Sequence, residues 1–193
     1  MKEISESKLD DKLKNIKENI MKLKNLGVEN YYCANVLDWF NEILIKNHSI
    51  YESKRNRDKV DNETYKKNRQ NVYWINFGNN IGSEFRDYHY AVVIHESKYT
   101  ALVVPLTSKK EEPPQWILDN KEVIVDLGEI KGYPHECKEC YACTFLLQSV
   151  SKKRLDRCGN KNNRYELELD NIQMNKICDK IKEITYNSID IKS

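Results

Sequence analysis

Apolar residues in the first part of the chain recur at the spacing of one face of an α-helix, and charged residues fill the other faces. Steps of three and four residues separate Leu9, Leu13, Ile16, Ile20 and Leu23. After Gly27 a second apolar set follows at Val36, Leu37, Phe40, Ile43 and Leu44. The pattern predicts a helical hairpin over residues 1–48. Because the first stripe is short for an autonomous coiled coil, we expect it to pack on the second helix or on the main domain. The alternative is a helix used for docking or dimerisation.

Residues 49–70 differ in character, because seven basic residues between Lys54 and Arg69 accompany only three acidic ones. Such a run is usually a solvated linker or an exposed helix. We therefore predict a charged linker over residues 49–70. The alternative is a basic segment that faces RNA.

From Asn71 the pattern changes to short runs of β-branched and aromatic residues, which are typical of β-strands. The runs are 72–77, 90–94, 100–104, 122–127 and 142–150. Turns containing glycine or proline separate most of them, and no helical stretch is expected between them. Five short strands in this arrangement indicate a compact antiparallel barrel or sandwich.

A final helix follows the strands. Asp170 is its predicted N-cap, and its apolar side is expected to contain Ile172, Ile177, Ile181 and Ile184. We therefore predict an α+β fold in three parts: a helical extension over residues 1–48, a charged linker over 49–70 and a barrel domain with a C-terminal helix over 71–193.

The composition excludes several classes of protein. The 193 residues include 32 Lys and Arg against 30 Asp and Glu, so any nucleic-acid site must come from local clusters of charge. No apolar run approaches the length of a membrane-spanning helix, and the first residues lack the apolar segment of a signal peptide. These features predict a cytoplasmic protein without membrane contact, whose six cysteines are reduced thiols or metal ligands.

Two loops between predicted strands gather side chains suited to phosphodiester cleavage. The loop 78–89 contains Glu84, Arg86 and His89, and the loop 105–110 contains Thr107 and Ser108. Together they offer a base, an acid, hydroxyl donors and positive charge, which a metal-free cleavage needs. Because polar loops between strands are common, the same residues also fit ordinary turns.

Several short motifs occur in a characteristic order between residue 71 and about residue 185. They are the strand 72–77, Gly82-Ser83-Glu84, the strand 90–94, Val104-Pro105-Leu106-Thr107-Ser108 and the stretch 148–155. In this order they resemble the MazF/PemK (Kid-like) toxins. The resemblance implies a small SH3-like antiparallel β-barrel with a C-terminal helix. It further implies the toxin of a type II toxin–antitoxin system, an endoribonuclease that cleaves single-stranded RNA by 2′-hydroxyl attack without metal or cofactor. Such a toxin forms a homodimer and is neutralised by a cognate antitoxin.

The side chains of the two loops and of the basic clusters suggest roles in such a reaction. Glu84 or His89 removes the proton of the 2′-hydroxyl, Thr107 and Ser108 hold a phosphate oxygen, and Arg86 supplies positive charge. The residues expected to bind RNA are Lys109, Lys152, Lys153, Arg154 and Tyr88.

This chain departs from the family pattern at two positions. His89 stands where the family places a catalytic arginine, and Gln148 stands where the closing motif has another arginine. An imidazole titrates near neutrality and suits proton transfer, which favours an active site. The alternative is a catalytically degenerate barrel module that binds RNA or a protein partner. A third interpretation is a relative of the CcdB-type gyrase poisons, which share the barrel.

The cysteines are dense enough to consider a zinc site. The candidate ligands are Cys137, Cys140 and Cys143, preceded by His135, with Cys158 as a fourth thiolate. In an extended chain, however, Cys137 and Cys140 point to opposite faces. We therefore predict that no metal is bound.

Overall fold

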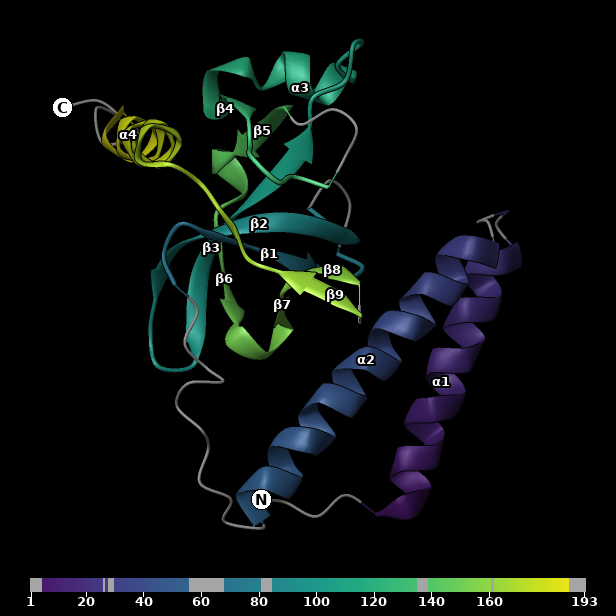
Figure 1. Cartoon of the computed structure of the whole chain (residues 1–193). Coiled ribbons are helices and arrows are strands. Elements are labelled where there is room, and N and C mark those ends of the chain that lie inside the picture. The colour runs from purple at the N-terminus through teal and green to yellow at the C-terminus, as the bar shows by residue number, and fades with distance from the viewer. Residues whose placement is uncertain are drawn as a thin grey trace, which may run out of the picture. The chain divides into compact units, whose positions relative to one another are not determined.

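The computed structural model describes residues 5–25, 27, 30–55, 68–80, 85–134, 139–160 and 162–187. The chain divides into two compact units, Met1–Asp58 and Lys59–Ser193. The first contains helices and the second contains the strands together with further helices (Figure 1). Within the described residues, no helix is long and apolar enough to cross a membrane.

The first unit is the predicted helical hairpin. Helices α1 (Glu6–Asn25) and α2 (Asn30–Arg55) contact each other, and Gly27 lies between them with a positive φ of 79°. None of the residues of α1 is buried, and Leu9 and Leu13 remain about half exposed. Helix α2 continues to Arg55, past the expected boundary at residue 48 and into the segment predicted as a linker. Residues 56–67 of that segment lie outside the described part of the chain.

The second unit is built around an antiparallel sheet, as predicted. In the described part of the chain it has eight strands in the order β10-β1-β2-β3-β5-β4, with β6 also paired to β3 and β7 to β1. Two further strands, β8 and β9, form a separate hairpin. The strand bounds are β1 Asn71–Asn76, β2 Tyr88–Glu96, β3 Thr100–Ser108, β4 Ile124–Glu129, β5 Glu139–Cys143, β6 Gln148–Ser151, β7 Leu155–Asp156, β8 Cys158–Asn160, β9 Asn163–Tyr165 and β10 Leu167–Glu168.

Strands β1, β2 and β3 contribute to two apolar cores because successive side chains point to opposite faces. On one face, Val72, Val92 and Val104 pack with residues of β4, β5 and the C-terminal helix. On the other, Ile75 and Val93 belong to a cluster that includes residues of β6 and β7. The sheet is curled, and an apolar cluster covers each of its two faces. The predicted barrel with a helical extension is therefore confirmed.

The predicted single strand over residues 142–150 is wrong. Strand β3 pairs with β5 at Leu106↔Ala142 and with β6 at Val103↔Gln148. The step along β3 is three residues, whereas the step from 142 to 148 is six. The extra residues leave the sheet as a 3₁₀ turn, η2 (Thr144–Leu146), where the Thr144 hydroxyl donates to the carbonyl of Val123.

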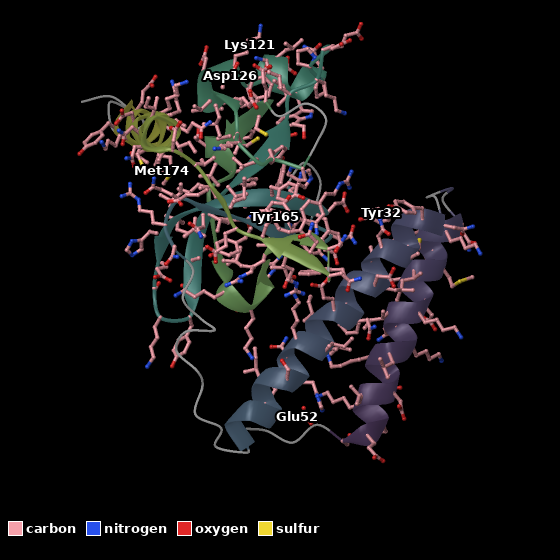
Figure 2. All side chains as sticks on the ribbon, viewed as in Figure 1. Tyr32, Glu52, Lys121, Asp126, Tyr165 and Met174 are labelled. Atoms are coloured by element: carbon pink, nitrogen blue, oxygen red, sulfur yellow. The ribbon has the colours of Figure 1, made fainter. Side chains whose placement is uncertain are left out.

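The C-terminal helix α4 (Asn171–Asn187) begins where the sequence predicts. The Asp170 side chain accepts a hydrogen bond from the Gln173 amide N–H, and the Gln173 side chain accepts one from Asp170, which forms a reciprocal capping box. Met174 and Ile177 face the core (Figure 2). Ile172 is wrong as a member of the apolar side, because it is 70% exposed. Five residues from Ile177, it points well away from that side of the helix.

Two further helical segments, α3 (Gln115–Asp119) and η1 (Lys121–Val123), follow the paired prolines 113–114, and η3 (Lys152–Arg154) follows β6. Helix α4 lies beside β4 (Figure 1). Gln173 on α4 donates hydrogen bonds to the carbonyls of Leu127 and Glu129, and so ties the helix to that strand.

Candidate functional site

Four strand ends meet at one edge of the sheet, here called the loop edge. Strands β1 and β3 end there, and strands β2 and β5 begin there, because each neighbouring pair is antiparallel. Asn76 pairs with Tyr88, and Ser108 pairs with Cys140. The sheet therefore brings the predicted residues His89, Thr107 and Ser108 to the same edge.

The loop that carries Arg86 is closed at its base by backbone hydrogen bonds. The amide of Phe77 donates to the carbonyl of Asp87, and the amide of Asp87 donates to the carbonyl of Gly78, both at 2.9 Å. The Asn80 side chain also donates to the carbonyl of Phe85 at 2.6 Å. Asp87 adopts a φ of 65°, a left-handed conformation that costs a non-glycine residue about 1–2 kcal/mol. Arg86 is exposed, and Glu84 lies outside the described residues.

His89 is a half-buried imidazole between aromatic rings. Its ring centroid lies 4.3 Å from that of Phe85 and 6.5 Å from that of Phe77. Burial lowers the pKa of His89 below its ordinary value, while the Asp87 carboxylate and a hydrogen bond to the backbone of Arg86 act in the opposite direction. The imidazole is consequently neutral at pH 7 and can accept a proton.

Thr107 and Ser108 point to opposite faces of β3. Leu106 pairs with Tyr90, so the position after Leu106 runs beside the position before Tyr90, which is His89. Thr107 therefore belongs to the face of His89. Ser108 turns toward the other face, where its side chain hydrogen-bonds the buried Tyr133, whose pKa is raised chiefly by burial.

Lys109 is held in an exposed cluster of charges at the end of β3. Its Nζ lies 2.9 Å from the carboxylate of Asp126 and 3.5 Å from that of Glu139. It also lies 5.7 Å from the centroid of the Tyr141 ring. The hydrogen bond that Lys109 donates to the Asp126 carboxylate is the main cause of the raised pKa of Lys109. A phosphate that approached Lys109 would compete with these two carboxylates.

The basic stretch 152–154 divides into residues with different surroundings. Lys152 is only 5% exposed, and its Nζ lies 2.6 Å from the carboxylate of Glu96. Lys153 is half-buried. Arg154 donates from Nη2 to the carbonyl of Asn76, the last residue of β1. The guanidinium of Arg154 therefore lies at the loop edge, whereas the ammonium of Lys152 is held by Glu96.

Comparison with known proteins identifies the family of this chain. Residues 68–185 match the family described as "PemK-like, MazF-like toxin of type II toxin-antitoxin system". The chain belongs to this family. Sequence comparison with curated proteins finds no match.

Solved structures similar to this chain include two of MazF from Deinococcus radiodurans. One is of MazF (Form-I), at 14% identity, and the other is of MazE–MazF (Form-II), at 13% identity. Each alignment covers 62% of this chain and 96% of the other, with a TM-score of 0.40.

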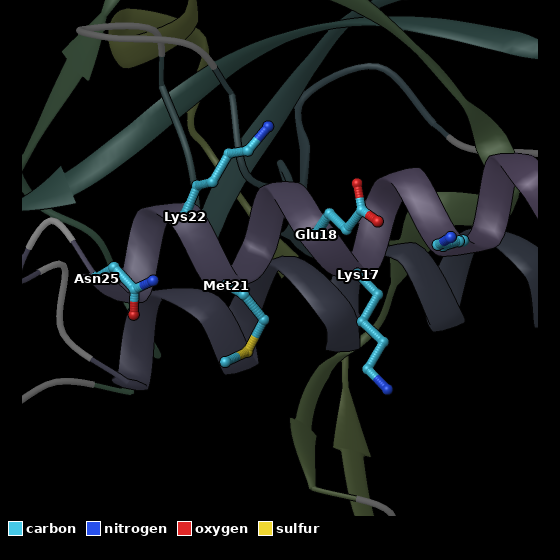
Figure 3. Close-up of a pocket in the computed structure, with 6 residues that line it drawn as sticks. Lys17, Glu18, Met21, Lys22 and Asn25 are labelled. Atoms are coloured by element: carbon cyan, nitrogen blue, oxygen red, sulfur yellow. The ribbon is translucent and has the colours of Figure 1, made fainter.

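The PemK/MazF match begins at residue 68 and so leaves the helical hairpin outside it. A hollow lies on α1 alone, lined by Lys14, Lys17, Glu18, Met21, Lys22 and Asn25 (Figure 3). These residues lie on a different face of the helix from Leu9, Leu13 and Ile16. The hollow combines lysines with a single carboxylate and holds no paired acid and base.

Three described cysteines of the PemK/MazF domain, Cys140, Cys143 and Cys158, are buried thiols, and Cys178 is half-buried. Burial raises the pKa of Cys143 and of Cys158 to about 12, and Cys158 donates from Sγ to the carbonyl of Val72. Among the described residues, no three His, Cys, Asp or Glu side chains gather as metal ligands. Cys137 and His135 lie outside the described part of the chain.

Sequence reasoning missed three residues at the loop edge of this PemK/MazF domain. Tyr133 and Tyr141 flank Ser108 and Lys109, and Asp87 closes the loop with its left-handed backbone. The Gly132-Tyr133-Pro134 turn signals a bend, but it does not reveal which strand the tyrosine reaches. In the structure the tyrosine side chain interacts with Ser108 on β3 and Cys140 on β5.

Proposed function

We propose that this chain is the toxin of a type II toxin–antitoxin system and a metal-independent endoribonuclease acting on single-stranded RNA in the cytoplasm. One observation carries the proposal. Within the part of the chain that matches the PemK/MazF family, a neutral imidazole, a threonine hydroxyl and a guanidinium meet at one sheet edge. These are His89, Thr107 and Arg154.

The proposed reaction uses each group for one task. Neutral His89 accepts the proton of the RNA 2′-hydroxyl, whose oxygen forms a bond to the adjacent phosphorus as the bond to the 5′-oxygen breaks. Thr107 donates a hydrogen bond to a non-bridging phosphate oxygen, and Arg154 with Arg86 stabilises the developing negative charge. The leaving 5′-oxygen takes a proton from Glu84 or from a lysine. The products carry a 2′,3′-cyclic phosphate and a 5′-hydroxyl.

Ser108 has a smaller part in this scheme than the family resemblance implies. Its side chain bonds Tyr133 on the other face of β3, so Thr107 supplies the hydroxyl on the face of His89. The cognate antitoxin and the homodimer remain proposals drawn from the family. We expect the antitoxin to cover the loop edge of this chain, and a second copy of the chain to complete the site there.

The decisive experiment is cleavage of a mixed-sequence single-stranded RNA by the full chain in the presence of EDTA. His89→Ala is expected to lower the rate about 10²–10⁴-fold. His95→Ala is the matched control, because His95 lies exposed on the same strand β2, and it should leave the rate unchanged. Strict dependence on Mg²⁺, or equal rates for both variants, would contradict the proposed chemistry.

A catalytically degenerate module is the second candidate, and the histidine at the position of the family arginine favours it. His89→Arg distinguishes the two, because arginine stays protonated and cannot exchange a proton at neutral pH. If the unaltered chain does not cleave RNA and His89→Arg does, the degenerate module is correct. If His89→Arg keeps its activity and His89→Ala loses it, the position contributes a positive charge to cleavage and not proton exchange.

A further inference from the structure

Four aromatic side chains form a continuous ladder across β1, β2 and the loop before β5. The Trp74 ring lies 4.6 Å from Tyr90 and 5.7 Å from Tyr88, centroid to centroid. Tyr90 in turn packs edge-on against Tyr133 at 5.1 Å. Trp74 and Tyr88 are nearly parallel, with an interplanar angle of 14°, which is a stacked arrangement.

The ladder runs from the interior to the surface. Tyr133 is 5% exposed, Trp74 and Tyr90 are half-buried, and Tyr88 is 51% exposed. Because the Trp74 ring covers one side of Tyr88, the exposed surface of Tyr88 lies on its other side and at its rim. Tyr90 shares this environment with Tyr165 and has a pKa raised to about 12, mainly by burial.

The charge beside the ladder changes along β1. Asp156 pairs with Trp74 across β1 and β7, and its carboxylate disfavours a phosphate at that point. Two residues further along β1, Arg154 reaches the carbonyl of Asn76, which pairs with Tyr88. A phosphate is therefore favoured at the Tyr88 end, next to the exposed ring.

We propose that Tyr88, backed by Trp74, is a stacking platform for one nucleobase of single-stranded RNA, with an adjacent phosphate at Arg154. This inference rests on the proposed function, since it locates a base next to the phosphate that His89 and Thr107 address. Side chains alternate along β2, so Tyr88 and His89 lie on opposite faces of it. The bound RNA must therefore cross the loop edge between these two residues. The platform stacks on any base, because every nucleobase has a π-face.

The test measures binding separately from cleavage. The full chain is titrated into a fluorescein-labelled, mixed-sequence oligonucleotide with 2′-O-methyl groups throughout, which cannot undergo 2′-hydroxyl attack. Tyr88→Ala is expected to weaken binding about tenfold to a hundredfold, the usual range for loss of one base stack. Tyr88→Phe keeps the ring and should bind like the unaltered chain. Tyr99→Ala removes a tyrosine that is 60% exposed at the β2–β3 turn, and it is the matched control.

A second probe separates the base from the backbone. With a strand of abasic sugar-phosphate units, Tyr88→Ala should bind as well as the unaltered chain, because no base is present to stack. Circular dichroism checks that Tyr88→Ala is folded. Equal affinity of Tyr88→Ala and the unaltered chain for the 2′-O-methyl strand would overturn the platform, as would an equal loss in Tyr88→Phe.

The outcomes also distinguish this inference from the proposed function. Tyr88-dependent binding by a chain that cleaves no RNA would support the platform and refute the nuclease. If the chain cleaves RNA but its binding does not depend on Tyr88, the nuclease is supported and the platform is refuted. Failure of the unaltered chain to bind the 2′-O-methyl strand would overturn the platform.

Discussion

The two compact units of the chain both have regular apolar patterns, one of helical and one of strand type, but they bury their apolar side chains to very different depths. In the unit Lys59–Ser193, Ile75, Val93 and Val103 have no exposed surface. In the unit Met1–Asp58, Leu9 and Leu13 are 52% and 51% exposed. Apolar spacing thus predicts which face of an element turns away from water, whereas depth of burial depends on how many layers cover that face. Strands β1–β3 contribute to two cores, while α1 and α2 share one seam.

The same contrast holds for polar groups. The unit Lys59–Ser193 contains the half-buried His89 and the buried Lys152. The hairpin has ion pairs at its surface, such as Lys46 with Glu42 one turn apart on α2. We expect mutations and pH to affect the stability of the two units very differently.

The largest expected effect comes from separating the units. Residues 1–58 alone should show little helicity, because isolated helices of this length are marginal in water and α1 buries none of its residues. Residues 59–193 alone should keep the far-ultraviolet circular dichroism of a β protein and unfold cooperatively, since both core clusters lie within them. A helical and concentration-independent 1–58 fragment, or an unfolded 59–193 fragment, would contradict this contrast.

Truncation of one apolar side chain in each unit should give the next largest difference. Ile75→Ala is expected to lower the free energy of unfolding by about 2–5 kcal/mol, because it leaves a cavity in a packed core. Leu13→Ala removes a half-exposed side chain and should cost less than about 1 kcal/mol. Urea denaturation followed by tryptophan fluorescence measures both, because Trp39 on α2 reports on the hairpin and a Trp39→Phe background isolates the signal of the barrel unit. Equal losses would show that the hairpin is packed as deeply as the barrel.

Ion pairs give a smaller contrast of the same kind. Glu96→Ala should destabilise the barrel unit by about 2–3 kcal/mol, because it leaves the buried Lys152 ammonium without its carboxylate. Glu42→Ala breaks the one-turn pair with Lys46 on α2 and should cost about 0.5 kcal/mol. Thermal unfolding of both variants measures the difference. Lys152→Met should be milder than Glu96→Ala, since Glu96 can be solvated.

The smallest expected effect is a pH dependence. Burial lowers the pKa of folded His89 below its ordinary 6.5, so the unfolded chain takes up a proton first as the pH falls. The free energy of unfolding should therefore decrease as pH falls through the window just below 6.5, by at most about 1.4 kcal/mol per pH unit. His89→Gln should remove this slope. His48→Gln, at an exposed position of α2, is the control and should preserve it.

Local rules explain the parts of the fold that the sequence predicted. Spacings of three and four residues predicted the hairpin, and β-branched runs predicted strands near β1, β2, β3 and β4. Asp170 predicted the start of α4, because a cap and its partner at Gln173 lie within one turn of chain. The order of short motifs from residue 71 to about 185 resembled the family pattern, and the match over residues 68–185 confirms that prediction.

Only the tertiary structure decided which side chains share an environment. The strand predicted over 142–150 breaks because β3 pairs with β5 and β6 in registers that leave extra residues between them. Lys152 looks like its neighbour Arg154 in the sequence, yet Glu96, far away along the chain, draws it into the interior. The side chain of Ser108 hydrogen-bonds Tyr133 on another segment, and Trp74 meets Tyr88 through the pairing of β1 with β2. These contacts join residues distant in sequence, so no local pattern encodes them.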